Sequence, residues 1–268
     1  MNYAFIGLGN MAGAILRGMQ TSGRFRDDKL YGFDTNPQAA LELEKSMNLI
    51  PAGSADEAAA NAEVIVLCVK PQVMGSVLQD IRESIDQSKA VITIAAGLPI
   101  SFYESHLSEK IAVIRAMPSI NAMALSAASA VCGNRYADER NMMTAMKLLG
   151  AIGAVHEVEE KHFAAFSAIA GAAPAFAFLF ADALAQAGVK AGLTRKLSDQ
   201  VAAELLQGSG KLLMESGAHP RALMDKVTSP GGTTIEGVMA LEQRGFSAAL
   251  HAAVQAVIDK DIKLGKES

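Results

Sequence analysis

The sequence predicts an α/β fold in which a doubly wound parallel sheet is followed by an all-helical domain. Short, continuous apolar runs alternate with helical patterns up to residue 158, which is typical of a parallel sheet that helices cover on both faces. Beyond this point the β-branched residues thin out and helix-forming residues dominate. We therefore expect two domains, residues 1–158 and residues 159–268.

The individual elements follow from the spacing of the apolar residues. Runs rich in Val and Ile between turn residues predict strands, and apolar residues at every third or fourth position predict helices. The expected strands are residues 3–6, 30–33, 64–69, 91–94 and 111–115, with a weaker pair at 128–132 and 154–158. The expected helices are residues 11–21, 38–47 and 138–149 in the first domain, and 163–187, 194–216, 220–227, 233–244 and 246–263 in the second.

The composition excludes several classes of protein. Half of the 268 residues are apolar and 19% are charged, which fits a globular protein and not a disordered chain. The net charge is −4 and no Lys- or Arg-rich run occurs, so we expect no nucleic-acid partner. The two cysteines, Cys68 and Cys132, lie too far apart for a disulfide framework. Reduced thiols and the lack of a signal-peptide pattern together indicate a cytoplasmic protein.

One uncharged segment, residues 163–181, is just long enough to cross a bilayer. It is mostly alanine, it is interrupted at Gly171 and Pro174, and charged residues crowd both of its ends. Such helices suit close helix–helix packing inside a protein better than lipid. We therefore expect no association with a membrane.

The histidines and serines do not form a familiar catalytic or metal-binding motif. The five histidines show no spacing typical of metal ligands, and no G-x-S-x-G nucleophile motif is present. We therefore expect chemistry that needs no metal.

A glycine-rich turn follows the first expected strand and opens the first expected helix. Gly7 permits the tight turn, Gly9 lets the backbone approach a pyrophosphate, and Ala12 lets the helix pack closely on the strand. The helix N-terminus adds unpaired N–H groups and a partial positive charge. This pattern predicts a dinucleotide-binding domain of the Rossmann type. The expected cofactor-binding residues of this turn are Ile6, Gly7, Leu8, Gly9, Asn10 and Met11.

Asp34 stands at the end of the second expected strand. An acidic residue at this place accepts hydrogen bonds from the adenosine ribose of NAD, whereas a nearby arginine favours the 2′-phosphate of NADP. No basic residue follows closely, but Asp34 could also cap the helix that begins near Pro37. The residues leave the choice between NAD and NADP open.

Two further strands end in residues that are expected to border the cofactor. Ligands of open α/β sheets bind beyond the carboxyl ends of the strands. Lys70 would contribute a charge there, unless it is simply a solvated surface lysine. The small residues after position 94 leave room for a nicotinamide ring. The candidate residues are Cys68, Val69, Lys70, Pro71, Ala95 and Ala96.

A second glycine-rich turn, at residues 229–234, lies in the helical domain. Thr233 and Glu236 have the spacing of a capping box, which predicts that a helix begins at Thr233. Gly231 and Gly232 free the backbone to direct N–H groups at a ligand, so the turn suits a substrate carboxylate. Thr234 would place its hydroxyl beside that anion. A purely structural turn is the alternative interpretation.

Five motifs, in this order, resemble those of the pyrroline-5-carboxylate reductase family, and the resemblance covers essentially the whole chain. They begin at Gly7, Val69, Ile94, Arg115 and Ser229. The last is the most specific, whereas the first is shared by many Rossmann enzymes.

The resemblance implies reduction of 1-pyrroline-5-carboxylate to proline by NADPH or NADH, the final step of proline biosynthesis. The family favours NADPH, whereas Asp34 favours NADH. It also implies an interlocked helical homodimer that can assemble into a decamer. By resemblance, Thr234 is the catalytic hydroxyl that hydrogen-bonds the imine nitrogen. The residues implied to hold the substrate are Ser229, Gly231, Gly232, Thr233 and Thr234.

The sequence departs from the family pattern at two places. Ser119, Ile120 and Asn121 stand where the family has an asparagine after proline, and residues 170–173 lack the family's serines. These differences leave open a reductase of another cyclic imine, or a dinucleotide-binding regulator without turnover. A β-hydroxyacid dehydrogenase is a further alternative, although the stretch between His162 and Val189 contains no lysine to serve as its acid or base.

Overall fold

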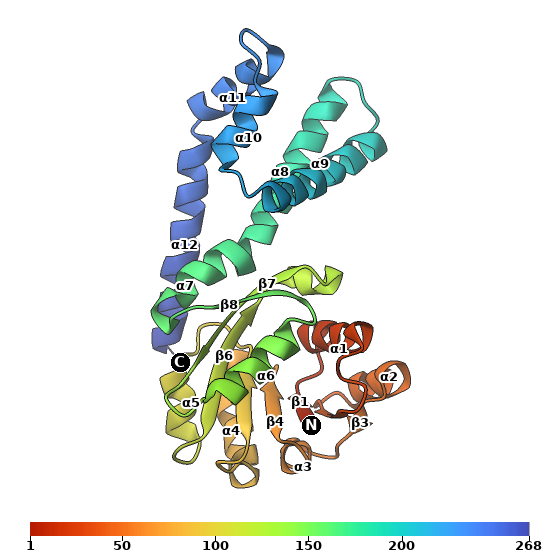
Figure 1. The fold of residues 1–268 in the computed structure, drawn as a ribbon, viewed down its shortest axis with the longest axis vertical. Coiled ribbons are helices and arrows are strands. Elements are labelled where there is room, and N and C mark those ends of the chain that lie inside the picture. Colours follow the sequence, from red (N-terminus) through yellow and green to blue (C-terminus); the bar gives the residue numbers. More distant parts are fainter. Residues whose placement is uncertain (268) are drawn as a thin grey trace. The chain divides into compact units, whose positions relative to one another are not determined.

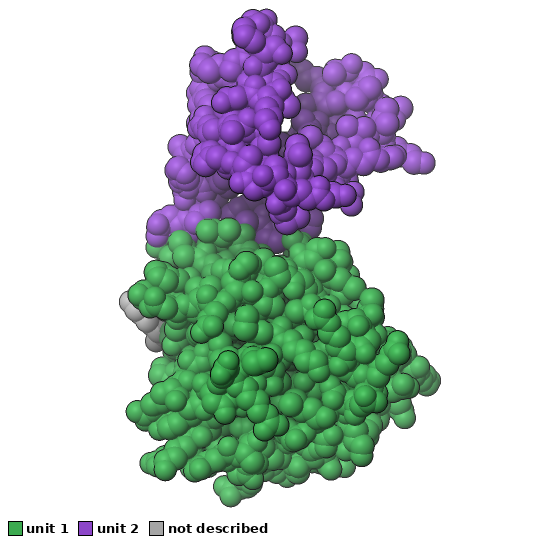
Figure 2. All heavy atoms as spheres, in the orientation of Figure 1, with its two compact units in different colours: residues 1–171, 257–268 green, residues 172–256 purple. Residues whose placement is uncertain are grey.

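The computed structural model describes residues 1–267, and the chain forms two compact units (Figure 2). Unit 1 contains Met1–Gly171 and the described residues after Ala256, whereas unit 2 contains Ala172–Ala256. The chain therefore leaves unit 1 once and returns to it once. The predicted domain boundary after residue 158 stays a prediction.

Unit 1 is built on one sheet with the strand order β3-β2-β1-β4-β5-β6-β7-β8 (Figure 1). Strands β1 to β6 run parallel, β7 is antiparallel to β6, and β8 is parallel to β7. The chain order reverses between β1 and β4, and such a switch point is where open α/β sheets bind ligands. The strands are β1 Asn2–Ile6, β2 Lys29–Phe33, β3 Ile50–Pro51, β4 Val64–Leu67, β5 Ala90–Thr93, β6 Ala112–Pro118, β7 Ala127–Gly133 and β8 Gly153–Glu157.

Helices cover both faces of this sheet. The side chains of Val64 and Val66 pack with α1, α2 and α6, while those of Ile65 and Leu67 pack with α3, α4 and α5. Because successive strand residues point to opposite faces, one continuous apolar strand supplies two cores. The helices of unit 1 are α1 Asn10–Ser22, α2 Pro37–Met47, α3 Ala55–Ala60, α4 Met74–Ile81, α5 Ile100–His106, α6 Glu139–Leu149 and α7 Phe163–Phe166.

Unit 2 is helical throughout. It contains α8 Ala173–Lys190, α9 Arg195–Ser216, α10 Pro220–Val227, α11 Thr233–Gln243 and the first part of α12 Phe246–Glu267. Left-handed Gly192, Gly217 and Gly245 stand in the turns between these helices. Glycine suits these positions because other residues adopt a positive φ with difficulty.

The predicted helix over residues 163–187 is present but contains a π-helical segment, Ser167–Ala172, between α7 and α8. Pro174 lies in the first turn of α8. Its ring carries no N–H and would clash with the carbonyl four residues earlier in a regular α-helix. A wider π turn before the proline is therefore the arrangement that lets the chain continue as a helix.

The other elements for which the sequence predicts a range agree with the structure to within a few residues. The short strand β3, Ile50–Pro51, and the short helices α3, α4 and α5 were not predicted, because so few residues carry little periodic signal. The structure shows the α/β sheet followed by helices that the sequence predicts.

Candidate functional site

The glycine-rich turn joins β1 to α1 at the switch point of the sheet. Gly7 has a φ of 89°, and its N–H donates a hydrogen bond to the Phe33 carbonyl over 2.8 Å. A Cβ at this position would lie 2.9 Å from both the carbonyl carbon of Cys68 and Cγ1 of Val69. Gly7 is therefore required by both its backbone conformation and the neighbouring end of β4.

Gly9 serves a different purpose in the same turn. It is the N-cap of α1 with a φ of −72°, and a Cβ built there meets no described atom within 4 Å. The first turn of α1 begins at Asn10, followed by the half-buried Met11, and it has no side-chain cap. Its N–H groups and the open space at Gly9 form a surface that an anion can approach closely.

Asp34 follows β2 directly and is half-buried. Its Oδ2 accepts a hydrogen bond from the Leu8 N–H over 2.7 Å, and its Oδ1 accepts one from the Asn36 N–H over 2.8 Å. The carboxylate thus links the glycine-rich turn to the end of β2. It does not cap α2, because Asn36 is the N-cap and its side chain accepts from the Gln38 N–H.

The chain after β4 lies beside this turn. The Cys68 N–H donates to the Ile6 carbonyl over 2.8 Å, which continues the pairing of β1 and β4 beyond their ends. Burial raises the pKa of the Cys68 thiol far above its usual range. Val69 then leads to Lys70, which is exposed and precedes a short 3-10 turn that begins at Pro71.

The chain after β5 forms the next part of the same sheet edge. Ala95 is buried and its N–H donates to Thr93 Oγ1 over 3.4 Å, whereas Ala96 is exposed. Gly97 follows with a φ of 79°. The cofactor-binding residues predicted from the sequence therefore lie at the carboxyl ends of the adjacent strands β1, β2, β4 and β5.

The second glycine-rich turn lies in unit 2, between α10 and α11. The Gly232 N–H donates to the Ser229 carbonyl over 3.0 Å, and Gly231 has a φ of 66°. Proline at the second position and a left-handed glycine at the third are typical of a type II turn. The turn leads into the first turn of α11, where the hydroxyls of Thr233 and Thr234 are exposed.

The structure corrects one detail of this turn. Helix α11 begins at Thr233, as predicted, but its N-cap is Gly232 and no side chain caps it. The predicted capping box of Thr233 and Glu236 is wrong, because the extended N-cap conformation lies one residue earlier, at a glycine. The first N–H groups of α11 consequently have no capping side chain to compete with a ligand.

The two places where the sequence departs from the family pattern lie in unit 1 or at its boundary. Ser119 is buried directly after β6, and its Oγ has no hydrogen-bond partner among the described residues. Residues 170–173 span the end of the π segment and the start of α8. Within the described chain, no group of three His, Cys, Asp or Glu residues is placed to hold a metal ion.

Sequence reasoning missed a cluster beside the loop after β5. Arg115, on β6, hydrogen-bonds Glu160, and Glu160 accepts a hydrogen bond from the Ile100 N–H. Nearby, a Cβ at Gly265, close to the C-terminal end of α12, would lie 2.7 Å from the Gly97 carbonyl oxygen in the loop after β5. No local pattern could have revealed this cluster, because its members come from four distant parts of the chain.

Two family models match the chain. The model described as pyrroline-5-carboxylate reductase dimerisation matches residues 160–264. The model described as NADP oxidoreductase, coenzyme F420-dependent, matches residues 2–97. The two matches fall on the helical part and on the glycine-rich part of the sheet, respectively.

Curated relatives match over nearly the full length. The pyrroline-5-carboxylate reductase of Methanosarcina acetivorans is 34% identical over 263 residues, which cover 98% of this chain and 97% of the relative. That of Escherichia coli is 34% identical over 262 residues, with 98% and 97% covered. The chain belongs to the pyrroline-5-carboxylate reductase family. The resemblance found in the sequence is therefore confirmed.

Solved structures of the family share the fold. The pyrroline carboxylate reductase of Plasmodium falciparum with NADP bound has a TM-score of 0.87 and 29% identity, covering 99% of this chain and 98% of the other. The enzyme of Coxiella burnetii has a TM-score of 0.91 and 26% identity, with 98% of both covered. A 3-hydroxyisobutyrate dehydrogenase of Mycobacterium tuberculosis, at 20% identity and a TM-score of 0.51, shows a likeness of fold alone.

Membership in the family explains the long apolar helix. Among the described residues, one helical stretch, Glu160–Lys190, is long and apolar enough to cross a membrane. It lies within the part matched by the dimerisation model, in a family of soluble enzymes. This helix is therefore a core helix of a homo-oligomer and not a membrane span.

Proposed function

We propose that the chain is a pyrroline-5-carboxylate reductase, which reduces 1-pyrroline-5-carboxylate to proline with NADPH as the last step of proline biosynthesis. The observation that carries this proposal is the match, at 34% identity and over 98% of the chain, to pyrroline-5-carboxylate reductases. The glycine-rich turn of unit 1 and the second turn of unit 2 supply the two kinds of binding group that this reaction needs.

The residues present fit a dinucleotide. The open space at Gly9 and the uncapped N-terminus of α1 suit the pyrophosphate. When bound, NADPH supplies the hydride that reduces the C=N bond. The residues that would hold it are Ile6, Gly7, Leu8, Gly9, Asn10, Met11, Asp34, Cys68, Val69, Lys70, Pro71, Ala95 and Ala96.

The second turn binds the substrate. The N–H groups of Thr233 and Thr234, with Ser229 and Gly231 beside them, hold the carboxylate at the N-terminus of α11, whereas the Gly232 N–H closes the turn on the Ser229 carbonyl. The Thr234 hydroxyl hydrogen-bonds the ring nitrogen, which carries a proton in the reactive iminium form. Since an iminium carbon is already electrophilic, the protein needs to orient the ring and hold the nitrogen, and no metal or nucleophile is required.

Asp34 affects the choice between the two cofactors. Both of its oxygens accept backbone hydrogen bonds, so a negative charge stays fixed at the end of β2. A charge at this place favours a ribose hydroxyl and repels a 2′-phosphate. NADPH is favoured by the match of residues 2–97 to an NADP oxidoreductase model, and Asp34 acts against this preference.

The assembly and the location follow from the family. The protein is a cytoplasmic homodimer joined through its helical part, and dimers assemble further into a decamer. The dimerisation model begins at residue 160, which supports a functional boundary after residue 158, between a dinucleotide-binding domain and a domain for dimerisation and substrate binding.

The test is the oxidation of NADPH and of NADH, followed at 340 nm, by purified protein with 1-pyrroline-5-carboxylate. We expect turnover with either cofactor and a higher kcat/KM with NADPH. Asp34→Ser should raise the preference for NADPH further. Turnover with another cyclic imine alone, or with a 3-hydroxyacid and the oxidised cofactor, would replace the proposed substrate. Cofactor binding without any turnover would indicate a regulator.

A further inference from the structure

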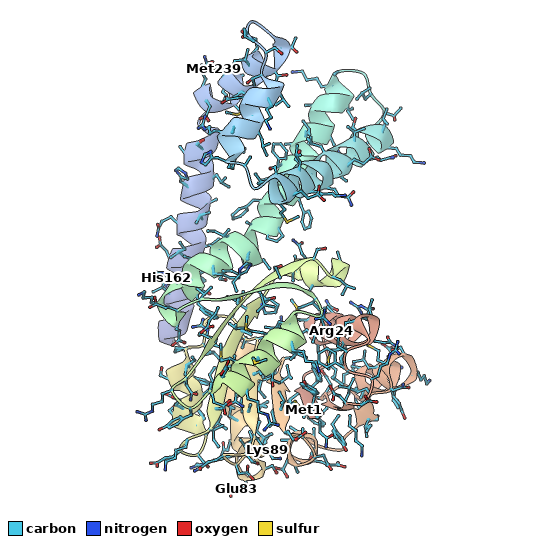
Figure 3. The ribbon with its side chains drawn as sticks, viewed as in Figure 1. Met1, Arg24, Glu83, Lys89, His162 and Met239 are labelled. Carbon is cyan, nitrogen blue, oxygen red and sulfur yellow. The ribbon has the colours of Figure 1, made fainter. Side chains whose placement is uncertain are left out.

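Strand β5 is apolar except for Thr93, whose side chain is fully buried. Thr93 ends the strand at the carboxyl edge of the sheet, whereas Lys89, which Figure 3 labels, directly precedes the strand at its other end. Thr93 and Val91 point to the face that packs with α3, α4 and α5, because alternate strand residues share a face. A hydroxyl in this apolar core is unfavourable unless it is hydrogen-bonded. Its partners therefore indicate what the hydroxyl is for.

The first partner is Tyr103, which lies on α5 and belongs to the same core. The oxygens of the two hydroxyls lie 2.6 Å apart, and neither side chain is exposed. Burial raises the pKa of Tyr103 to about 12, so the phenol keeps its proton at neutral pH. The contact between Thr93 and Tyr103 is therefore a short hydrogen bond between two neutral groups that water does not reach.

This polar pair is not needed to fill the core. Valine and phenylalanine have nearly the same shapes as threonine and tyrosine, and they carry no hydroxyl that must leave water. Replacing both partners of a buried hydrogen bond by apolar groups of the same shape is nearly neutral for stability or even favourable. The pair of Thr93 and Tyr103 therefore points to a role other than packing.

The second partner of the Thr93 hydroxyl is the loop after β5, residues 94–99. Thr93 Oγ1 accepts a hydrogen bond from the N–H of the buried Ala95 over 3.4 Å. The Ile94 N–H donates to the Leu67 carbonyl over 3.1 Å, which continues the pairing of β4 and β5 for one residue beyond their ends. A bond as long as that of Ala95 depends on an oxygen that keeps its place, and the short contact with the phenol fixes this oxygen.

The other end of the loop is also held by a side chain. Glu160 Oε1 accepts the N–H of Ile100, the first residue of α5, over 2.7 Å. The same oxygen lies 3.1 Å from Nη1 of Arg115, which is paired with Thr93 in the register of β5 and β6. Because α5 carries Tyr103, the bond to Ile100 fixes the start of the helix that locks the Thr93 hydroxyl. All of these groups belong to unit 1.

We propose that Thr93 is a positioning residue whose hydroxyl, locked by Tyr103, holds Ala95 and thereby sets the loop over residues 94–99 on which the nicotinamide ring rests. Ala96 is exposed and Gly97 has a φ of 79°, so the middle of the loop needs a fixed start. Since Thr93 is fully buried, it acts through the loop and not by contact with the ring. The inference rests on the proposed function, because the proposed cofactor site includes Ala95 and Ala96.

The test compares Thr93→Val with Thr93→Ser, which keeps the hydroxyl, and with Thr144→Val as a matched control. The Thr144 hydroxyl donates to the Arg140 carbonyl over 2.8 Å within α6, so the control loses a hydrogen bond elsewhere in unit 1. Hydrogen–deuterium exchange over residues 94–98, without added cofactor, reports the loop directly. In Thr93→Val the Ala95 N–H loses its acceptor and should exchange at least about tenfold faster. Thr93→Ser and the control should exchange like the wild type.

Binding measurements separate the nicotinamide from the rest of the cofactor. Calorimetry gives the Kd of NADPH and that of 2′-phospho-ADP-ribose, which lacks the nicotinamide ring. In Thr93→Val the Kd of the fragment should change less than about twofold, because the glycine-rich turn is untouched, whereas the Kd of NADPH should rise at least about threefold. At saturating substrates kcat should fall at least about fivefold, since a small displacement of the reacting groups is enough to slow the reaction.

A double variant distinguishes positioning from folding. Thr93→Val alone leaves the Tyr103 hydroxyl buried without a partner, so the urea midpoint should fall. Adding Tyr103→Phe removes that hydroxyl and should restore the midpoint, but the Ala95 N–H still lacks its acceptor. Fast exchange and weak NADPH binding should therefore persist in the stable double variant. If Thr93→Val alone does not fold, the double variant supplies the same measurements.

Two results would overturn the proposal. One is a stable double variant with normal exchange over residues 94–98, because the hydroxyl pair would then serve folding alone. The other is faster exchange with an unchanged Kd of NADPH, because the loop would then not place the ring. Exchange and binding need no turnover. A wild-type protein that binds NADPH but does not reduce the imine would therefore contradict the proposed function, while these results would still decide the role of Thr93.

Discussion

The two units differ in where their apolar side chains lie. In unit 1, helices on both faces of the sheet enclose two large cores of fully buried Ile, Leu, Val, Met and aromatic residues. In unit 2, the described residues that are buried are small, namely Pro174, Ala185, Ser198 and Ala202. Its large apolar side chains are exposed instead, with Leu179 at 70% and Met214 at 80%.

The exposed side chains of unit 2 form a defined surface. An apolar groove of about 520 Å³ runs along α8 and α12 and is lined by Phe176, Leu179, Phe180, Phe246 and Leu250 among others. Apolar surface left in water is unfavourable by about 25 cal/mol per Å². Together with the dimerisation model over residues 160–264, this surface indicates that unit 1 completes its core within one chain, whereas unit 2 completes its core by association.

The largest expected effect comes from placing a charge in the apolar groove, because this tests directly whether unit 2 needs a partner copy. Leu179→Arg should weaken the dimer at least about a hundredfold, because burying a leucine contributes about 1.5–3 kcal/mol and a buried charge adds a penalty. Light scattering after gel filtration should show a monomer, and imine reduction should fall with it. Lys190→Ala, at the exposed end of the same helix, serves as the control. A dimer of normal affinity in Leu179→Arg would contradict the inference that unit 2 completes its core by association.

Substitutions at two glycines, Gly7 and Gly9, test unit 1 without changing unit 2. Gly7→Ala should lower the free energy of unfolding by at least about 1–3 kcal/mol, since alanine is strained at a φ of 89° and its Cβ meets the end of β4. Gly9→Ala should unfold at the wild-type urea concentration but bind NADPH at least about tenfold more weakly, because its methyl group fills the space that the pyrophosphate needs.

Urea unfolding and NADPH fluorescence titration separate these two effects. Dimerisation should be normal in both folded variants, because the glycines lie in unit 1. Equal losses of stability in the two variants would contradict the assignment of a folding role to Gly7 and a binding role to Gly9.

A substitution in the substrate turn should affect chemistry without affecting the fold of unit 2. Thr234 is exposed in the first turn of α11, so Thr234→Ala should lower kcat for imine reduction at least about tenfold while stability is little changed. Thr234→Ser keeps the hydroxyl and should retain most of the activity. Steady-state rates at saturating substrate check both variants, and an unaltered kcat in Thr234→Ala would remove this residue from the mechanism.

The last prediction concerns the reactivity of the two cysteines, both of which lie in unit 1. Burial, together with the charge of Glu160, raises the pKa of Cys132 to about 12, and burial raises that of Cys68 as well. Because the thiolate is the reactive form, alkylation by iodoacetamide at pH 8 should be at least about tenfold slower than in urea.

The same protection should persist in Leu179→Arg, because the core of unit 1 does not depend on the dimer. Thiols that react rapidly in that variant would show that unit 1 needs the partner copy after all. Mass spectrometry of the alkylated protein measures both rates.

Much of the fold and of the cofactor turn could be predicted from the sequence. Strands such as β4 and β5 are continuous apolar runs, and Gly7 and Gly9 carry the constraints of a local turn. The π segment before Pro174 was missed, because a proline indicates that the helix must adjust but not how. The capping box at Thr233 was wrong because Gly232 could adopt the N-cap conformation equally well.

The sequence by itself determined the longer strands and helices, the nucleotide-binding turn and the family, because each depends on residues close together in the chain. Only the tertiary structure decided which polar groups from distant parts of the chain come into contact. Asp34 accepts a hydrogen bond from the Leu8 N–H, and Arg115 donates one to Glu160. Such pairs leave no periodic signal, since they form only when the sheet brings distant segments to one edge.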